Sequence, residues 1–351
     1  MRAYFLTAVS LIIPGVVAAP AHASTIQAYT GVIGGSNTLC AGSGGPVPAI
    51  SAYFQSAGDF GVLTDPGGNS IGDCGLSGGI SSVTGSAGPQ TSTTSLASTP
   101  YASYPANSIS GTASATANYG SVSVSTSTDL NGVEGPNGQG ESVAFGIVSD
   151  TLNVVCAPTC ASGYLAFDFT LNATVTVGST TGGAALEVDV QAGDNANESI
   201  FYGNLEGTSV YAAGIEDVAG TLSPGQPVPG CVTGTGTFTC TNAALQTYMM
   251  PVTFTPGLAF SFGLIGETNQ GANETISVDP PDMSLSGIQV YDASGNLVSD
   301  FTITSGSGST YGADGFESGP SSSAPEPGTF LPMMAGIIFL AFRGRRFLYL
   351  K

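Results

Sequence analysis

The feature that most constrains the fold is a stretch of 13 residues, Leu165 to Val177, in which apolar and polar side chains alternate. The odd positions are apolar: Leu165, Phe167, Phe169, Leu171, Ala173, Val175 and Val177. The even positions carry Ala166, Asp168, Thr170, Asn172, Thr174 and Thr176. A period of two is that of a β-strand, because helical geometry would scatter these apolar residues all round the axis. The stretch therefore predicts a long strand with one buried face and one wet face.

Shorter stretches repeat this pattern between turn residues. Ser121–Thr128 places its two valines on one face, and Leu258–Leu264 places two leucines and two phenylalanines on one face. Leu186–Val190 alternates again after the turn residues Gly182 and Gly183. We expect this last segment to pair antiparallel with the strand at 165–177.

The remaining segments carry weaker signals. Residues 77–118 are rich in Ser, Thr, Ala and Gly and suit either a loop or thin strands, and residues 193–236 look loop-rich. Asp292–Asn296 has the composition of a turn, so Ile288–Tyr291 and Leu297–Ile303 are expected to form a hairpin.

Many short strands without a long amphipathic helix predict an all-β fold, an antiparallel β-sandwich or jelly-roll-like domain, over residues 24–304. Residues 305–324, rich in Ser, Gly and Pro, are expected to be a flexible linker. A propeller or solenoid is disfavoured because the chain has no repeat of fixed period.

Charge is distributed very unevenly. No Lys, Arg or His occurs from Ser24 to Pro327, and all 24 carboxylates lie between Asp59 and Glu326. This region is therefore a polyanion without internal salt bridges. Nucleic acid and anionic membrane surfaces are excluded as electrostatic partners, which leaves divalent cations and cationic surfaces.

The N-terminus has the features of a secretory signal peptide over residues 1–23. Arg2 supplies the positive start, Tyr4–Val17 the apolar core, and Ala21-His22-Ala23 a small-residue cleavage site. We expect cleavage between Ala23 and Ser24.

The C-terminus carries a second set of signals. Pro325, Glu326 and Pro327 precede the uncharged segment Thr329–Phe342, and three arginines follow. Those arginines are Arg343, Arg345 and Arg346. The apolar segment spans roughly 21 Å as a helix and approaches the ~30 Å hydrocarbon core when residues 347–350 are added. We expect a single transmembrane helix with the arginine cluster in the cytoplasm and the rest of the chain outside.

This order of motif, apolar helix and arginine cluster resembles the PEP-CTERM sorting tail of Gram-negative bacteria, over residues 325–351 only. The same tail is also labelled an ice-binding protein C-terminal domain, a label that says nothing about ice for this chain. The resemblance implies recognition, and cleavage near the motif, by a membrane enzyme of the exosortase type. It also implies a host that makes extracellular polysaccharide.

Six cysteines in an exported chain indicate disulfides. Proximity in sequence suggests three pairs: Cys40–Cys74, Cys156–Cys160 and Cys231–Cys240. A metal site at Cys156 and Cys160 is the rival interpretation, which neither a histidine nor a second close pair supports.

The residue types in the exported region exclude most catalytic chemistry. Without His, Lys or Arg it cannot build a Ser-His-Asp triad, a Schiff base or an arginine clamp. A pair of carboxylates, as in glycoside hydrolases, is the remaining option. Glu187 and Asp189 share a strand face, which we expect to be solvated.

A cofactor is not expected, although one loop has ligands that suit calcium. It holds four oxygen-bearing side chains: Asp194, Asn195, Asn197 and Glu198. The spacing does not match an EF-hand, and a polar loop is the simpler interpretation.

These features predict a non-enzymatic protein of the cell surface or extracellular matrix. The expected partners are signal peptidase and the export machinery, the exosortase-type enzyme, the inner membrane through the C-terminal helix, and extracellular polysaccharide. The alternative is a secreted carbohydrate-binding module on the same scaffold, with exposed Tyr and Phe as stacking platforms.

Overall fold

A computed structural model describes most of the chain between Ser24 and Glu317. The described residues are 24–36, 76–100, 108–131, 138–157, 160–178, 183–195, 198–206, 209–214, 228–269 and 275–317. Within these ranges the protein is all-β and antiparallel, with no helix, which confirms the predicted fold class at this level. In this part of the chain there is accordingly no helix that is long and apolar enough to span a membrane.

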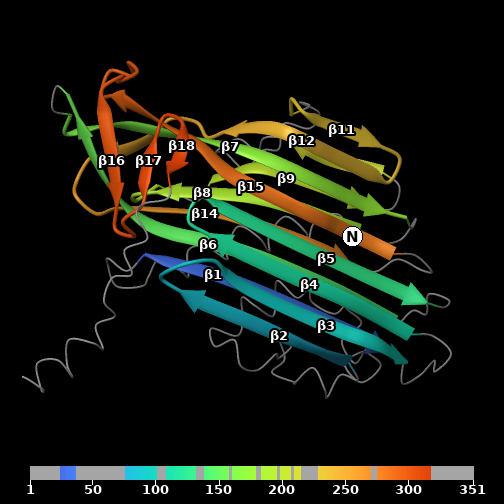
Figure 1. The fold of residues 1–351 in the computed structure, drawn as a ribbon. Helices are drawn as coiled ribbons and strands as arrows, with labels where there is room; N and C mark the ends of the chain where they lie inside the picture. Colours follow the sequence, from blue (N-terminus) through green and yellow to red (C-terminus); the bar gives the residue numbers. More distant parts are fainter. Residues whose placement is uncertain are drawn as a thin grey trace, which may run out of the picture. The chain divides into compact units, whose positions relative to one another are not determined.

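The strands form two antiparallel sheets (Figure 1). The first sheet contains β1 (Thr25–Ser36), β2 (Leu76–Gly85), β6 (Gly138–Cys156), β8 (Gly183–Ala192), β9 (Glu198–Glu206), β10 (Ser209–Gly214), β14 (Leu258–Asn269), β16 (Phe301–Ser305), β17 (Thr310–Gly312) and β18 (Gly315–Glu317). The second contains β3 (Gln90–Pro100), β4 (Ser108–Asn118), β5 (Ser121–Asn131), β7 (Ser162–Val177), β11 (Cys231–Gly234), β12 (Thr237–Gln246), β13 (Met250–Thr253) and β15 (Thr275–Asp292).

Nine of these strands pair in a nested order. β5 pairs with β15, β6 with β14, β7 with β12 and β13, and β8 with β9. Successive members of each half alternate between the two sheets, so the chain behaves as a double-stranded ribbon folded back and forth across one core.

The core lies between the sheets and is apolar. On β7 every odd residue from Leu165 to Val177 is buried, and most even residues are half-buried on the outer face, as the alternation predicts. The Phe167 ring stacks on Phe260 of β14, with centroids 4.5 Å apart. The inward face of Leu258–Leu264 is also as predicted. The two best sequence signals therefore meet across the core from opposite sheets.

The predicted pairing of 165–177 with 186–190 is wrong. The second segment belongs to β8 in the other sheet, where it pairs with β9 and β14. The apolar side chains of β7 and β8 point into the same core from opposite sides, so these strands face one another and do not lie edge to edge. Residues 77–118 hold strands β2, β3 and β4, and the supposedly loop-rich middle holds β9, β10 and β11.

The predicted hairpin at 288–303 forms its turn and the first backbone bonds beside it, including that from the N–H of Val298 to the carbonyl of Val290, and then ends. The Asp292 carboxylate accepts hydrogen bonds from the backbone N–H of Ser294 and Asn296, at 2.8 and 2.9 Å. The side-chain amide of Asn296 also donates to this carboxylate. That bond first, and then the backbone bonds, lower the pKa of Asp292. After a single bridge between Tyr291 and Leu297, the chain crosses to the first sheet, where β16 pairs with β6. Burying Ile303 in the core favours this crossing over continuation of the hairpin.

The fold extends beyond the expected domain boundary. β17 and β18 lie within residues 305–317, part of the predicted flexible linker, and Tyr311 of β17 is buried. One compact unit extends to Glu317.

Two predicted disulfides are present, Cys156–Cys160 and Cys231–Cys240. The second joins directly paired residues of β11 and β12. Cys40 and Cys74 lie outside the described residues. The disulfide at Cys156 and Cys160 excludes the rival metal site there.

Candidate functional site

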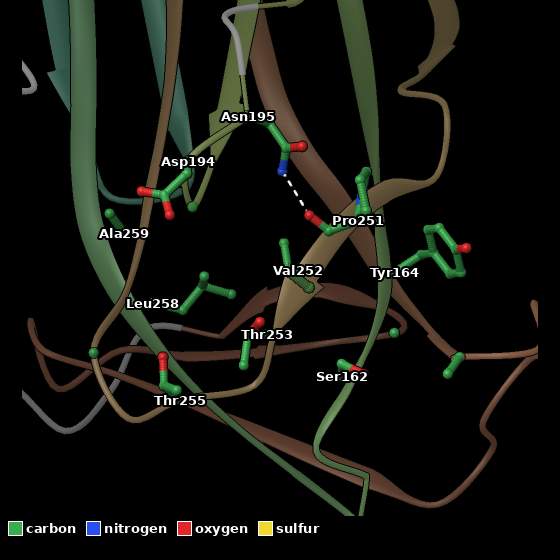
Figure 2. A pocket seen from close by; sticks show the side chains of 14 residues that line it. Ser162, Tyr164, Asp194, Asn195, Pro251, Val252, Thr253, Thr255, Leu258 and Ala259 are labelled. Carbon is green, nitrogen blue, oxygen red and sulfur yellow. Dashed lines mark hydrogen bonds between the residues drawn. The ribbon is translucent and has the colours of Figure 1, made fainter.

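An open depression of about 670 Å³ lies where several chain turns meet at one end of the sheets (Figure 2). Its lining comes from the start of β7, the turn after β8, β13, the start of β14 and the turn after β15. The polar side chains among its lining residues are Ser162, Tyr164, Asp194, Asn195, Thr253 and Thr255. Hydroxyl, amide and carboxylate groups can hydrogen-bond a neutral polar ligand, and no described residue offers it a positive charge.

The turn after β8 is held in place by Asn195. Its side-chain amide donates to the carbonyl of Ala192 at 2.6 Å and to the carbonyl of Pro251 at 2.9 Å. Figure 2 shows the second bond closing the upper side of the depression, with the exposed Asp194 carboxylate nearby. Asn195 thus connects the β8–β9 turn to β13 and fixes the wall.

Of the four oxygen-bearing side chains in the calcium loop that the sequence suggested, the structure describes those of Asp194 and Asn195 only. The Asn195 amide is occupied as a donor, Asn197 lies outside the described residues, and Glu198 begins β9. Among the residues that the structure describes, no three His, Cys, Asp or Glu side chains are grouped closely enough to hold a metal ion.

A row of polar and aromatic side chains adjoins the depression on the outer face of the second sheet. Tyr164 of β7 is paired in register with Tyr291 of β15. The Tyr291 hydroxyl donates to Gln289 at 2.5 Å, and the Gln289 amide donates to Asp168 at 2.9 Å. Gln246 of β12 donates to the other oxygen of Asp168 at 2.6 Å. We call these five residues the Tyr-Gln-Asp row.

The close approach of β7 to β15 in this row requires a glycine. A Cβ atom at Gly163 would lie 2.0 Å from the carbonyl oxygen of Tyr291, too close for any side chain. The sequence did not single out this row, because its members are distant in the chain; the only local signal was that Asp168 lies on the wet face of its strand.

The strand face of Glu187 and Asp189, which the sequence predicted to be solvated, is buried. Both side chains point away from the core residues of β8, yet they are only 5% and 0% exposed. Glu267 of the neighbouring strand β14 faces the same side and is 5% exposed. Every residue of β8 except Gln191 is buried, so alternation in sequence did not translate into alternation in exposure.

Asp150 is the centre of the densest hydrogen-bond network in the described part of the chain. Its carboxylate, 3% exposed, accepts bonds from the hydroxyls of Ser24 and Ser307, each at 2.6 Å, and from that of Tyr311 at 3.0 Å. Backbone N–H groups of Thr151 and Ser307 add two more. The network thus joins the start of β1, the end of β6 and the β16–β17 turn.

Burial and the nearby Asp150 charge raise the pKa values of two tyrosines. Desolvation first, and then the Asp150 carboxylate, raise the pKa of Tyr119 to about 12. The same causes raise the pKa of Tyr311 well above its usual value. Both hydroxyls therefore stay neutral donors at any physiological pH.

The sorting and anchoring residues of the C-terminal tail, and the Ala23 side of the expected cleavage site, lie outside the described residues; Ser24 is the first residue inside them. No protein-family model matches this chain, and no curated protein matches it.

Proposed function

We propose that this is an exported, non-enzymatic protein of the cell surface or extracellular matrix, targeted by a PEP-CTERM tail. The observation that carries the proposal is the charge distribution: cationic side chains occur only beside the two apolar terminal segments. A chain built this way keeps its positive charge in the cytoplasm and exports a polyanion.

The disulfides also support export. The described part of the chain contains two of them, and disulfides form and persist in oxidising compartments. The nested pairing of strands across two sheets suits the jelly-roll-like sandwich that would be displayed.

Each part has a defined role in this proposal. The signal peptide starts export, the C-terminal helix and arginine cluster hold the chain in the inner membrane, and an exosortase-type enzyme acts near Pro325-Glu326-Pro327. The two-sheet domain is then displayed. Its surface carboxylates contact the extracellular polysaccharide, with divalent cations bridging like charges.

The motif can be tested separately from the helix. In a host that carries an exosortase, the triple variant P325A/E326A/P327A keeps the apolar segment and the arginines. We expect it to accumulate uncleaved in the membrane fraction, whereas deletion of 325–351 should release the protein into the medium. The matched control S321A/S322A/S323A, just before the motif, should behave as wild type. Identical fractionation and mass for wild type and the triple variant would refute sorting by this motif.

A second candidate function is binding of a neutral carbohydrate at the Tyr-Gln-Asp row and the adjoining depression. Sugars are bound by aromatic faces together with amide and carboxylate groups that hydrogen-bond their hydroxyls. The row brings two tyrosines, two amides and one carboxylate onto one sheet face beside a hollow.

A glycan array probed with the purified protein tests this candidate. Y164A and D168N should each reduce binding at least tenfold, because one removes a stacking platform and the other a charged acceptor. Thr239→Ala, on an exposed position of β12, is the control and should leave binding unchanged. Equal binding by all three variants would exclude the row as the binding site.

A further inference from the structure

The expected mature N-terminus lies directly against Asp150, a buried carboxylate that accepts several hydrogen bonds. Ser24 is 8% exposed, and its hydroxyl is 2.6 Å from Asp150. The Ser24 nitrogen is separated from that hydroxyl oxygen by three bonds, so it lies within about 4 Å of it and within about 6.5 Å of the carboxylate. Processing between Ala23 and Ser24 would therefore change the chemistry beside Asp150.

Among the residues that the structure describes, Asp150 has no cationic neighbour. All five of its donors are neutral hydroxyl or backbone N–H groups. The sequence supplies no Lys, Arg or His between Ser24 and Pro327. A buried carboxylate is stabilised most by a nearby positive charge, which here has only one source within the exported region: a new α-amino group.

We propose that cleavage after Ala23 installs the α-ammonium group of Ser24 as the counter-ion of Asp150, and that this pair locks the mature fold. The proposal rests on the signal peptide of the proposed function. Hydrolysis of the Ala23–Ser24 peptide bond consumes one water, leaves a carboxylate on Ala23 and leaves a protonated amine on Ser24. One amide donor is thereby replaced by a charged group with three donors.

An ion pair between Ser24 and Asp150 would stabilise strands at both ends of the domain. Asp150 holds Ser307 and Tyr311, which belong to the β16–β17 region, while Ser24 starts β1. β1 and β16 are both neighbours of β6 along the same edge. A charge added at Ser24 thus stabilises the C-terminal strands through a shared carboxylate.

Gly306 packs closely against this site. A Cβ atom at Gly306 would lie 2.4 Å from the Thr151 hydroxyl and 3.0 Å from the Ser24 hydroxyl. Close packing of this kind holds the first residue of the mature chain near the carboxylate and disfavours a frayed end.

The test compares three forms of the chain ending at Lys351, purified in detergent. The first begins with a free Ser24 amine, the second has the same residue acetylated, and the third begins at Ala23. At pH 6.5 the free Ser24 form should unfold at a midpoint roughly 2 to 6 °C above the other two. The three forms share every side chain from Ser24 onward.

The pH dependence gives a second readout. A partner carboxylate raises the pKa of the amine above its usual value near 8, so the extra stability is present below pH 8 and is lost as pH rises through the raised value. Tyr119 and Tyr311 are the other titratable groups described around Asp150, and both belong to every form. Their ionisation therefore cancels in the difference.

Asp150→Asn should abolish the difference between free and acetylated forms. Equal midpoints for the free and acetylated wild-type chains at pH 6.5 would overturn the proposal, and so would a difference that persists unchanged in Asp150→Asn. If that variant does not fold, the comparison of acetylated and free wild type still decides the question. Mass spectrometry of the exported protein tests the cleavage itself: another N-terminus would refute the processing step, while the purified forms report on the ion pair independently.

Discussion

Truncation of Phe167 should be among the most damaging single substitutions in the protein. The side chain is fully buried on β7 and stacks on Phe260 of β14 at 4.5 Å with the rings 9° from parallel. The pair therefore joins the two sheets. Phe→Ala in a core costs about 3 to 5 kcal/mol in transfer and cavity terms. At roughly 2 to 4 °C per kcal/mol for a large domain, Phe167→Ala should lower the melting midpoint by roughly 6 to 20 °C.

The assay is thermal unfolding followed by circular dichroism with the disulfides intact. Val155→Ala serves as the control, because that side chain is 64% exposed at the end of β6 and its loss should cost within about 0.5 kcal/mol. The double variant with Phe260→Ala should be less damaging than the sum of the single variants, by about 0.5 to 1.5 kcal/mol for the ring contact. A drop of less than 3 °C for Phe167→Ala, or strict additivity, would refute the assignment of this stack as a link between the sheets.

Three further predictions concern cross-links, alkali and salt. Replacing Cys231 and Cys240 by serine should lower unfolding free energy by up to about 2.6 kcal/mol, the loop-closure value for a separation of 9 residues, and urea titration under non-reducing conditions would detect it. Between pH 10 and about 12 the stability should fall, because unfolded tyrosines ionise there while Tyr119 and Tyr311 hold their protons; a flat urea midpoint across that range would contradict their raised pKa values. Added NaCl should raise the melting midpoint, since the region from Ser24 to Pro327 carries 24 carboxylates and no cation to pair with them; a midpoint that falls with salt would show that repulsion is not limiting.

The sequence pattern correctly predicted those structural properties that depend on residues close together in the chain. The alternation at 165–177 predicted both the strand and its buried face, because backbone geometry alone makes side chains alternate. The disulfides at Cys156–Cys160 and Cys231–Cys240 could likewise be predicted, since closing a short loop costs little entropy. The charge asymmetry of the chain is a matter of composition alone.

Pairing and exposure were decided by the tertiary structure. A strand edge offers the same N–H and C=O groups to every candidate partner, so the sequence around Gly182 and Gly183 suggested a hairpin where the chain crosses between sheets. Glu187 and Asp189 had the spacing of a solvated face, yet both are buried because exposure depends on what covers a sheet.

The sequence by itself thus determined an all-β chain, two of its cross-links and a polyanion with cationic ends. Only the folded chain decided that Tyr164 would meet Tyr291, and that Ser24 and Tyr311 would both reach Asp150 from positions more than 100 residues away. The physical reason is that local backbone geometry sets each strand's faces, whereas long-range packing chooses which faces and edges come together.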